Sequence, residues 1–96
     1  FLIKNNQLSS ARIILNQVID LIPTIKEAHL NLGYIDYLTN KYEAAGLRLK
    51  QAIALDPDYI LAYENLYLIS KIQNDFINMN IYKNKILDID PNHILK

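Results

Sequence analysis

The residue types that could carry out chemistry are few in this chain. His29 and His93 are the only histidines and there is no cysteine, so the sequence offers neither a thiolate nucleophile nor the ligands of a zinc cluster. Asp56 and Asp58 flank a proline, but the other oxygen ligands and the glycine of a calcium loop are missing. No glycine-rich phosphate-binding loop is present. The sequence therefore predicts a protein that is not an enzyme and that holds no cofactor and no metal ion.

The overall composition argues against two further classes of function. Ten Lys and Arg residues balance ten Asp and Glu residues, whereas a protein that binds nucleic acid needs clustered positive charge. No apolar run approaches the roughly 20 residues that a membrane-spanning helix needs. The hydrophobic fraction of 51% supplies ample material for a core. Because the chain begins with Phe1 rather than Met, we expect it to be part of a longer protein.

The chain repeats with a period of 34, which is the spacing between its three prolines, Pro23, Pro57 and Pro91. An asparagine stands half a period before each proline, and a large apolar residue follows each asparagine two positions later. These marks are Asn6, Asn40 and Asn74, followed by Leu8, Tyr42 and Phe76. The period predicts one domain made of a partial unit over 1–23, full units over 24–57 and 58–91, and the start of another over 92–96.

Apolar spacing and helix-ending residues predict two antiparallel helices in each full unit. Thr24 and Glu27 have the spacing of a capping box, and Asp58 is the expected cap in the next unit. We expect turns at the three asparagines, since this residue tolerates a left-handed backbone. Residues 1–5 are expected to end an earlier helix. The expected helices cover 8–21, 24–38, 42–55, 58–72 and 76–89.

The predicted core lies along one stripe of each helix. Gly33 stands within its helix, where glycine costs roughly 1 kcal/mol relative to alanine, so we expect another helix to approach it closely. The inward residues are expected to be Ala28, Leu32, Ile35, Leu38, Ala45, Leu49, Ala52, Ile53, Ala62, Leu66, Ile69, Met79, Ile86 and Leu87.

In its period of 34 and in the residues that recur at that period, the chain resembles the tetratricopeptide repeat family. The middle unit carries the motif best, with His29, Leu32, Gly33, Ala45, Leu49, Ala52 and Pro57. The resemblance implies an all-α fold, a right-handed α-α superhelix of antiparallel helical hairpins. Asp36 and Ser70 depart from it, since the family prefers Tyr there, and so do Tyr67, Met79 and Lys83 in the third unit. We therefore expect the helices of the third unit to lie further apart or to tilt differently.

The resemblance also implies a concave groove, lined by the first helix of each unit, that binds a peptide or a helix of a protein partner. The residues at the matching positions, here called the groove set, are Glu27, Leu30, Asn31, Tyr34, Tyr37, Leu38, Leu61, Glu64, Asn65, Leu68, Lys71 and Ile72. For Leu30, Leu38, Leu61 and Ile72 the alternative is packing against the neighbouring unit. Some members of the family grip terminal carboxylates with Lys, Arg and Asn. Asn31 matches that clamp, but Leu61 and Asn65 occupy its cationic positions, so we expect no clamp.

Three alternatives to peptide binding remain open from the sequence. The chain could self-associate through uncapped ends, formed by Phe1 to Ile3 at one end and by Ile94 and Leu95 at the other. It could also be the non-catalytic repeat region of a larger enzyme. Pentatricopeptide repeats, which bind RNA, are the nearest competing family, but the period of 34, the pair Leu32-Gly33 and the zero net charge favour the first family.

Overall fold

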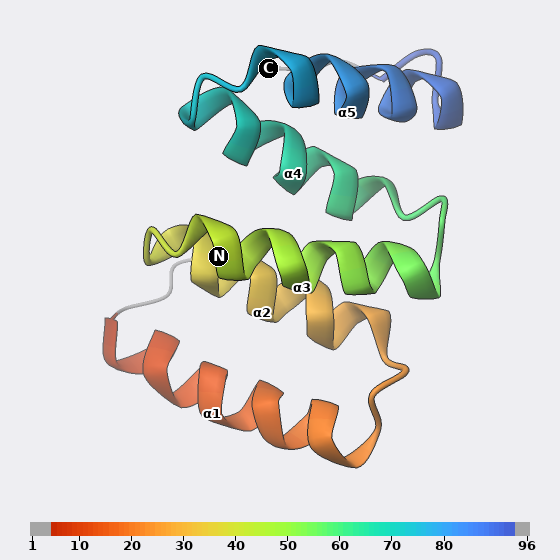
Figure 1. Ribbon diagram of the computed structural model, residues 1–96. Helices are drawn as coiled ribbons and strands as arrows, with labels where there is room; N and C mark the ends of the chain where they lie inside the picture. The colour runs from red at the N-terminus through yellow and green to blue at the C-terminus, as the bar shows by residue number, and fades with distance from the viewer. Residues whose placement is uncertain (1–4, 94–96) are drawn as a thin grey trace.

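The fold is all-α, as the sequence predicts. The computed structural model describes residues 5–93, and within that range it contains five helices and no strand. The helices stack in chain order from α1 at the bottom of the view to α5 at the top (Figure 1). Their bounds are α1 (Asn5–Leu21), α2 (Lys26–Leu38), α3 (Tyr42–Leu55), α4 (Ile60–Ile72) and α5 (Phe76–Ile89).

Two helical hairpins form the body of the structure, α2 with α3 and α4 with α5. The helix α1 packs against α2, and α3 packs against α4, so neighbouring hairpins share an interface. The helix α2 also contacts α4, although α3 separates them in sequence. The chain is thus a stack of antiparallel hairpins in which the first helices of successive units are neighbours.

Asparagines turn the chain inside both hairpins. Asn40 has φ of 63° and Asn74 has φ of 56°, the left-handed conformation that Asn adopts more readily than most residues. The turns expected at these two residues are confirmed. The turn expected at Asn6 is wrong, because Asn6 lies within α1. Asparagine permits a left-handed backbone but does not require it, and here the helix begins one residue earlier.

The predicted starts of α2 and α4 are two residues too early. The helix α2 begins at Lys26, and its N-cap residue, Ile25, makes no side-chain cap hydrogen bond within the described chain, so the capping box at Thr24 is wrong. Asp58 does not cap α4 either; its N–H donates to Asp56 Oδ1 at 3.1 Å. The N–H of Tyr59 donates to the Asp56 carbonyl at 3.1 Å, which closes a turn with proline at its second position. This turn delays the helix.

The core is built from small and branched residues where the two hairpins meet. The inward residues predicted for α2, α3 and α4 are buried, apart from the half-buried Ile53 and from Leu38. The prediction for Leu38 is wrong, because this last residue of α2 is 41% exposed. A Cβ at Gly33 would lie 3.0 Å from Leu49 Cγ and 3.3 Å from the Ala45 carbonyl oxygen, which confirms the close helix approach. The main cluster comprises Ala45, Leu49, Ala52, Ala62, Leu66 and Ile69.

The second hairpin is packed less closely than the first. Of the inward residues predicted on α5, Ile86 is fully buried, whereas Met79 and Leu87 are only half-buried. Lys83, which departs from the family motif, is exposed. The backbones of α2 and α3 stay close over more of their length than those of α4 and α5. The side chains of the third unit are therefore less fully buried, and a greater separation or a different tilt of its helices stays a prediction.

The first helix of each unit is fastened to the turn that precedes it. His29 Nε2 donates to the carbonyl oxygen of Pro23 at 2.8 Å, since a carbonyl can only accept. The hydroxyl of Tyr63 donates to the carbonyl oxygen of Pro57 at 2.9 Å. The two side chains stand one period apart, so they make the same contact with different chemistry. His29 is 5% exposed and therefore a packed histidine.

Two expectations concern residues at the ends of the chain. The described residues begin at Asn5, so the expected uncovered end at Phe1, Leu2 and Ile3 lies outside them, as does most of the helix tail expected over 1–5. Asn5, the last residue of that expected tail, belongs to α1. The helix start expected at Ile94 and Leu95 also lies outside the described residues. Between residues 5 and 93, the helices are too short or too polar to cross a membrane.

Candidate functional site

The groove set occupies two parallel stripes on neighbouring helices, one on α2 and one on α4. Residues three, four and seven apart share one face of a helix, so each stripe is continuous. Because α2 contacts α4, the structure brings the two stripes next to each other. The exposed members are Glu27, Asn31, Leu38, Leu61, Leu68, Lys71 and Ile72, and the half-buried members are Leu30, Tyr34, Tyr37, Glu64 and Asn65.

The apolar residues of the set differ in what covers them. Leu30 is half-buried and packs against the core cluster, as the packing alternative predicts. Leu38, Leu61 and Ile72 are 41%, 49% and 48% exposed, so the neighbouring unit does not cover them. Leu68 is 36% exposed on the same face of α4. The α4 stripe therefore presents three apolar side chains to solvent.

Tyr34 and Tyr37 stack on each other along α2, with ring centroids 6.1 Å apart and an interplanar angle of 25°. Tyr37 also packs against the core cluster and meets the Tyr42 ring of α3 at 6.2 Å. Tyr42 in turn donates its hydroxyl hydrogen to Asn40 Oδ1 at 3.0 Å. Tyr37 is consequently a structural residue as well as a surface residue, whereas no core contact of this kind involves Tyr34 among the described residues.

Several charged groups near the stripes form ion pairs or hydrogen bonds with one another. Glu64 Oε1 lies 3.3 Å from His93 Nε2. Lys26, beside Glu27, donates to Asp56 Oδ2 and lies 4.6 Å from the ring centroid of Tyr59. The hydrogen bond with Asp56 raises the pKa of Lys26 and lowers that of Asp56. Burial raises the pKa of the Tyr59 hydroxyl.

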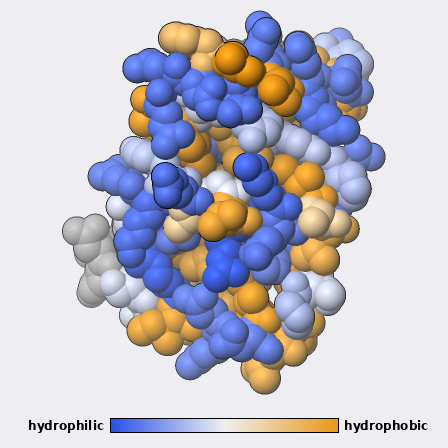
Figure 2. All heavy atoms as spheres, viewed as in Figure 1, coloured by the Kyte–Doolittle hydropathy of each residue, from blue (hydrophilic) through white to orange (hydrophobic). Residues whose placement is uncertain are grey.

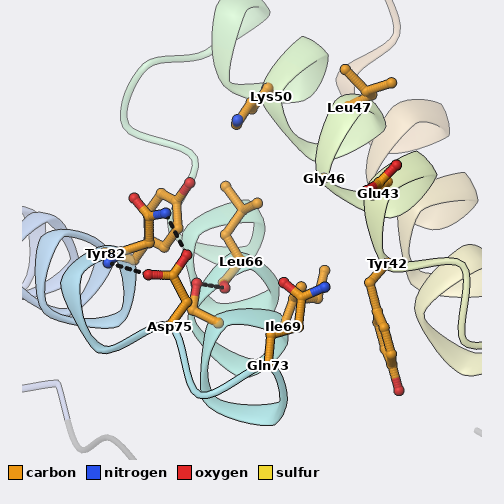
Figure 3. A pocket seen from close by; sticks show the side chains of 12 residues that line it. Tyr42, Glu43, Gly46, Leu47, Lys50, Leu66, Ile69, Gln73, Asp75 and Tyr82 are labelled. Atoms are coloured by element: carbon orange, nitrogen blue, oxygen red, sulfur yellow. Dashed lines mark hydrogen bonds between the residues drawn. The ribbon is translucent and has the colours of Figure 1, made fainter.

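The structure also contains a pocket that sequence reasoning missed. It opens between α3 on one side and α4 and α5 on the other, with a volume of about 340 Å³ (Figure 3). This volume is at the low end of the roughly 300–1,000 Å³ typical of ligand pockets. No residue of the groove set lines it. Its polar lining includes Glu43, Lys50, Ser70, Gln73, Asp75 and Tyr82.

The pocket lies where the preceding unit has an arginine. Arg12 reaches from α1 to α2, and its Nη2 donates to Asp36 Oδ1 and to Thr39 Oγ1, both at 3.0 Å. The residue one period after Arg12 is Gly46, which lines the pocket. A position-by-position comparison of the units shows that Gly46 lacks the side chain that Arg12 has in the preceding unit. The pocket could have been predicted from this difference.

The polar groups of the groove set and of the pocket are amides, hydroxyls and a few charged groups. No group of three or more His, Asp or Glu side chains in the described part of the chain is arranged to hold a metal ion. The arrangement can make hydrogen bonds and ion pairs.

Apolar side chains also face solvent at the two ends of the stack. Ile13, Ile14 and Leu21 of α1 are 60%, 58% and 82% exposed. On α5, Phe76, Ile77 and Ile81 are exposed as well, by 66%, 78% and 54%. Figure 2 shows apolar atoms at both ends, interspersed with hydrophilic ones.

The chain was compared with known protein families and with curated proteins. No family model matches it. No curated protein is significantly similar to it in sequence.

Proposed function

We propose that this chain is a tetratricopeptide-like repeat module that acts as a scaffold, binding a peptide or a helix of a protein partner along the groove set. The observation that carries the proposal is the exposed apolar stripe of α4, formed by Leu61, Leu68 and Ile72. A second stripe on α2 lies beside it and contributes Tyr34 and Leu38.

The two stripes supply different parts of a binding surface. Leucine, isoleucine and tyrosine side chains give apolar area that a partner can cover, and a tyrosine hydroxyl adds a polar tip. Asn31 and Asn65 each offer an amide that can both donate to and accept from the backbone of a bound chain. Together they suit a partner that presents apolar side chains at intervals along an extended or helical segment.

The test begins with peptides selected from a random library displayed on phage. Their affinities are measured by fluorescence anisotropy with the wild-type chain and with the double variant Leu61→Ala/Ile72→Ala. The matched control is Leu55→Ala/Ile22→Ala, which removes one leucine and one isoleucine that are 40% and 53% exposed and lie outside both the groove set and the pocket. Both pairs lie on the surface, so both variants should remain folded.

The groove variant should weaken binding at least about tenfold, because two apolar contacts of more than about 1 kcal/mol each are lost. The control should bind as the wild type does. Equal weakening in both double variants, or unchanged binding by the groove variant, would place the peptide elsewhere and end the proposal. Tyr37→Ala is a poor choice for this test, because Tyr37 supports the core.

Self-association is a second candidate function, favoured by the exposed apolar faces of α1 and α5. Neighbouring repeats normally cover such faces. If copies of the chain stack end to end, light scattering should show a mass that rises with concentration. The charge introduced by Ile77→Lys should return the chain to a monomer, and a wild-type chain that stays monomeric at millimolar concentration would exclude the idea.

A further inference from the structure

The two junctions between neighbouring units are built differently at equivalent positions. At the first junction, the Arg12 guanidinium on α1 binds the Asp36 carboxylate on α2 and the hydroxyl of Thr39, the C-cap residue of α2. At the second junction, Gly46 on α3 takes the place of the arginine. A Cβ on Gly46 would meet no described atom within 4 Å. The pocket is therefore the space from which a side chain is missing.

Ser70, which stands one period after Asp36, brings to the pocket a hydroxyl in the same bonding state as the Thr39 hydroxyl that binds Arg12. Thr39 Oγ1 donates to the Ile35 carbonyl at 3.0 Å, four residues back, which leaves its lone pairs for the guanidinium. Ser70 Oγ donates to the Leu66 carbonyl at 2.9 Å, also four residues back. Ser70 is only 5% exposed and lines the pocket, and a hydroxyl oxygen that donates its hydrogen can still accept a hydrogen bond. Its hydroxyl is an acceptor prepared for an incoming donor.

The charged groups around the pocket also favour a cation. Asp75 stands one period after Lys41, so an acidic residue replaces a basic one at this position. Both Asp75 oxygens accept from Asn78, at 3.2 and 2.6 Å, and each carboxylate oxygen keeps a further lone pair. Glu43 contributes a second carboxylate, and Lys50 is the one basic residue among the lining residues. The charged lining is thus net acidic.

We propose that this pocket binds the guanidinium group of an arginine side chain presented by a protein partner. The bound group would occupy the place that Arg12 occupies at the first junction. Its planar fork can donate to the Ser70 hydroxyl, to the Gln73 amide oxygen and to the Asp75 carboxylate. The pocket shares no residue with the groove set, so this proposal stands independently of peptide binding there.

The first experiment titrates the chain with N-acetyl-arginine amide while backbone amide signals are followed by NMR. The control probe is N-acetyl-citrulline amide, which has nearly the same shape but no charge. The arginine probe should produce saturable shifts at Gly46, Ser70 and Gln73, with a dissociation constant on the order of 1 mM for a single small side chain. Citrulline should produce none. Equal shifts from both probes, or no saturable shift from arginine, would overturn the proposal.

Variants then locate the site. Gly46→Arg supplies the missing side chain from within and should abolish the shifts, while Gly46→Ala leaves the pocket open and should retain them. Asp75→Asn keeps the helix cap but removes the charge, and it should weaken binding about tenfold. Shifts that survive in folded Gly46→Arg would refute the site. If that variant does not fold, Asp75→Asn decides, and unchanged affinity counts against the proposal. Groove binding should be unaffected by Gly46→Arg, which separates the two proposals.

Discussion

Two glycines within helices allow the same substitution to be tested in opposite environments. Replacing Gly46 with alanine should stabilise the chain by about 1 kcal/mol, because helix propensity improves and the added Cβ meets no described atom within 4 Å. At Gly33 the same gain is opposed by contacts of 3.0 and 3.1 Å with Leu49 and of 3.3 Å with the Ala45 carbonyl oxygen. Overpacking of this kind costs about 1–3 kcal/mol, so Gly33→Ala should lower stability by about 1 kcal/mol net.

The measurement is urea unfolding followed by circular dichroism. A domain of this size has an m-value of about 1 kcal/mol/M in urea, so the two variants should differ by about 2 M in their midpoints, with the wild type between them. Equal stabilisation by both substitutions would show that α2 and α3 do not approach each other closely at Gly33. Destabilisation by Gly46→Ala would show that the pocket is not open at that position, and it would remove the basis of the arginine proposal.

Three further predictions concern contacts between and within units. Arg12→Ala should cost about 2–3 kcal/mol in urea unfolding, because it leaves the Asp36 carboxylate buried without its cation, and adding Asp36→Ser should recover most of the loss. Tyr63→Phe should cost about 1 kcal/mol by the same assay through the lost hydrogen bond, and an unchanged midpoint would contradict the contact. The Lys26–Asp56 pair should stabilise the folded chain between pH 3.8 and pH 10.5, the ordinary pKa values of the two groups. Folding lowers the pKa of Asp56, so this stability is lost as the pH falls below 3.8. Folding raises the pKa of Lys26, so the stability is also lost as the pH rises above 10.5. Unfolding across pH should lose this contribution at both extremes, and Asp56→Asn should remove both losses.

Much of the fold could be predicted because prolines and asparagines end these helices in a repeated order. The bounds of α3 and α5 agree with the prediction, as do the ends of all five helices. The starts of α2 and α4 could not be placed by cap residues alone. After Pro57, a turn closed by the Tyr59 N–H takes the two positions that a capping residue would otherwise use. Local hydrogen bonding within the turn is stronger evidence for a helix start than residue type.

The surfaces were predictable to different degrees. The groove set follows from the period, because residues one period apart fall on equivalent faces of neighbouring helices. Whether Leu30 or Leu61 is covered depends on packing between units, which the period does not determine. The pocket was harder still, because it arises from a side chain that Gly46 lacks and from groups on three helices. Ser70 adds to it only because its own hydroxyl hydrogen is directed back to Leu66.

The hydrogen bonds that His29 and Tyr63 make to the preceding proline carbonyls bear on how such a chain diverges. An imidazole N–H and a phenol O–H serve the same carbonyl, so the position requires a donor at a given reach rather than a particular residue. Substitutions that keep the donor leave the junction between turn and helix intact. The residue types that mark a repeat can therefore be replaced while the geometry of the repeat is preserved, and sequence likeness between units fades sooner than structural likeness.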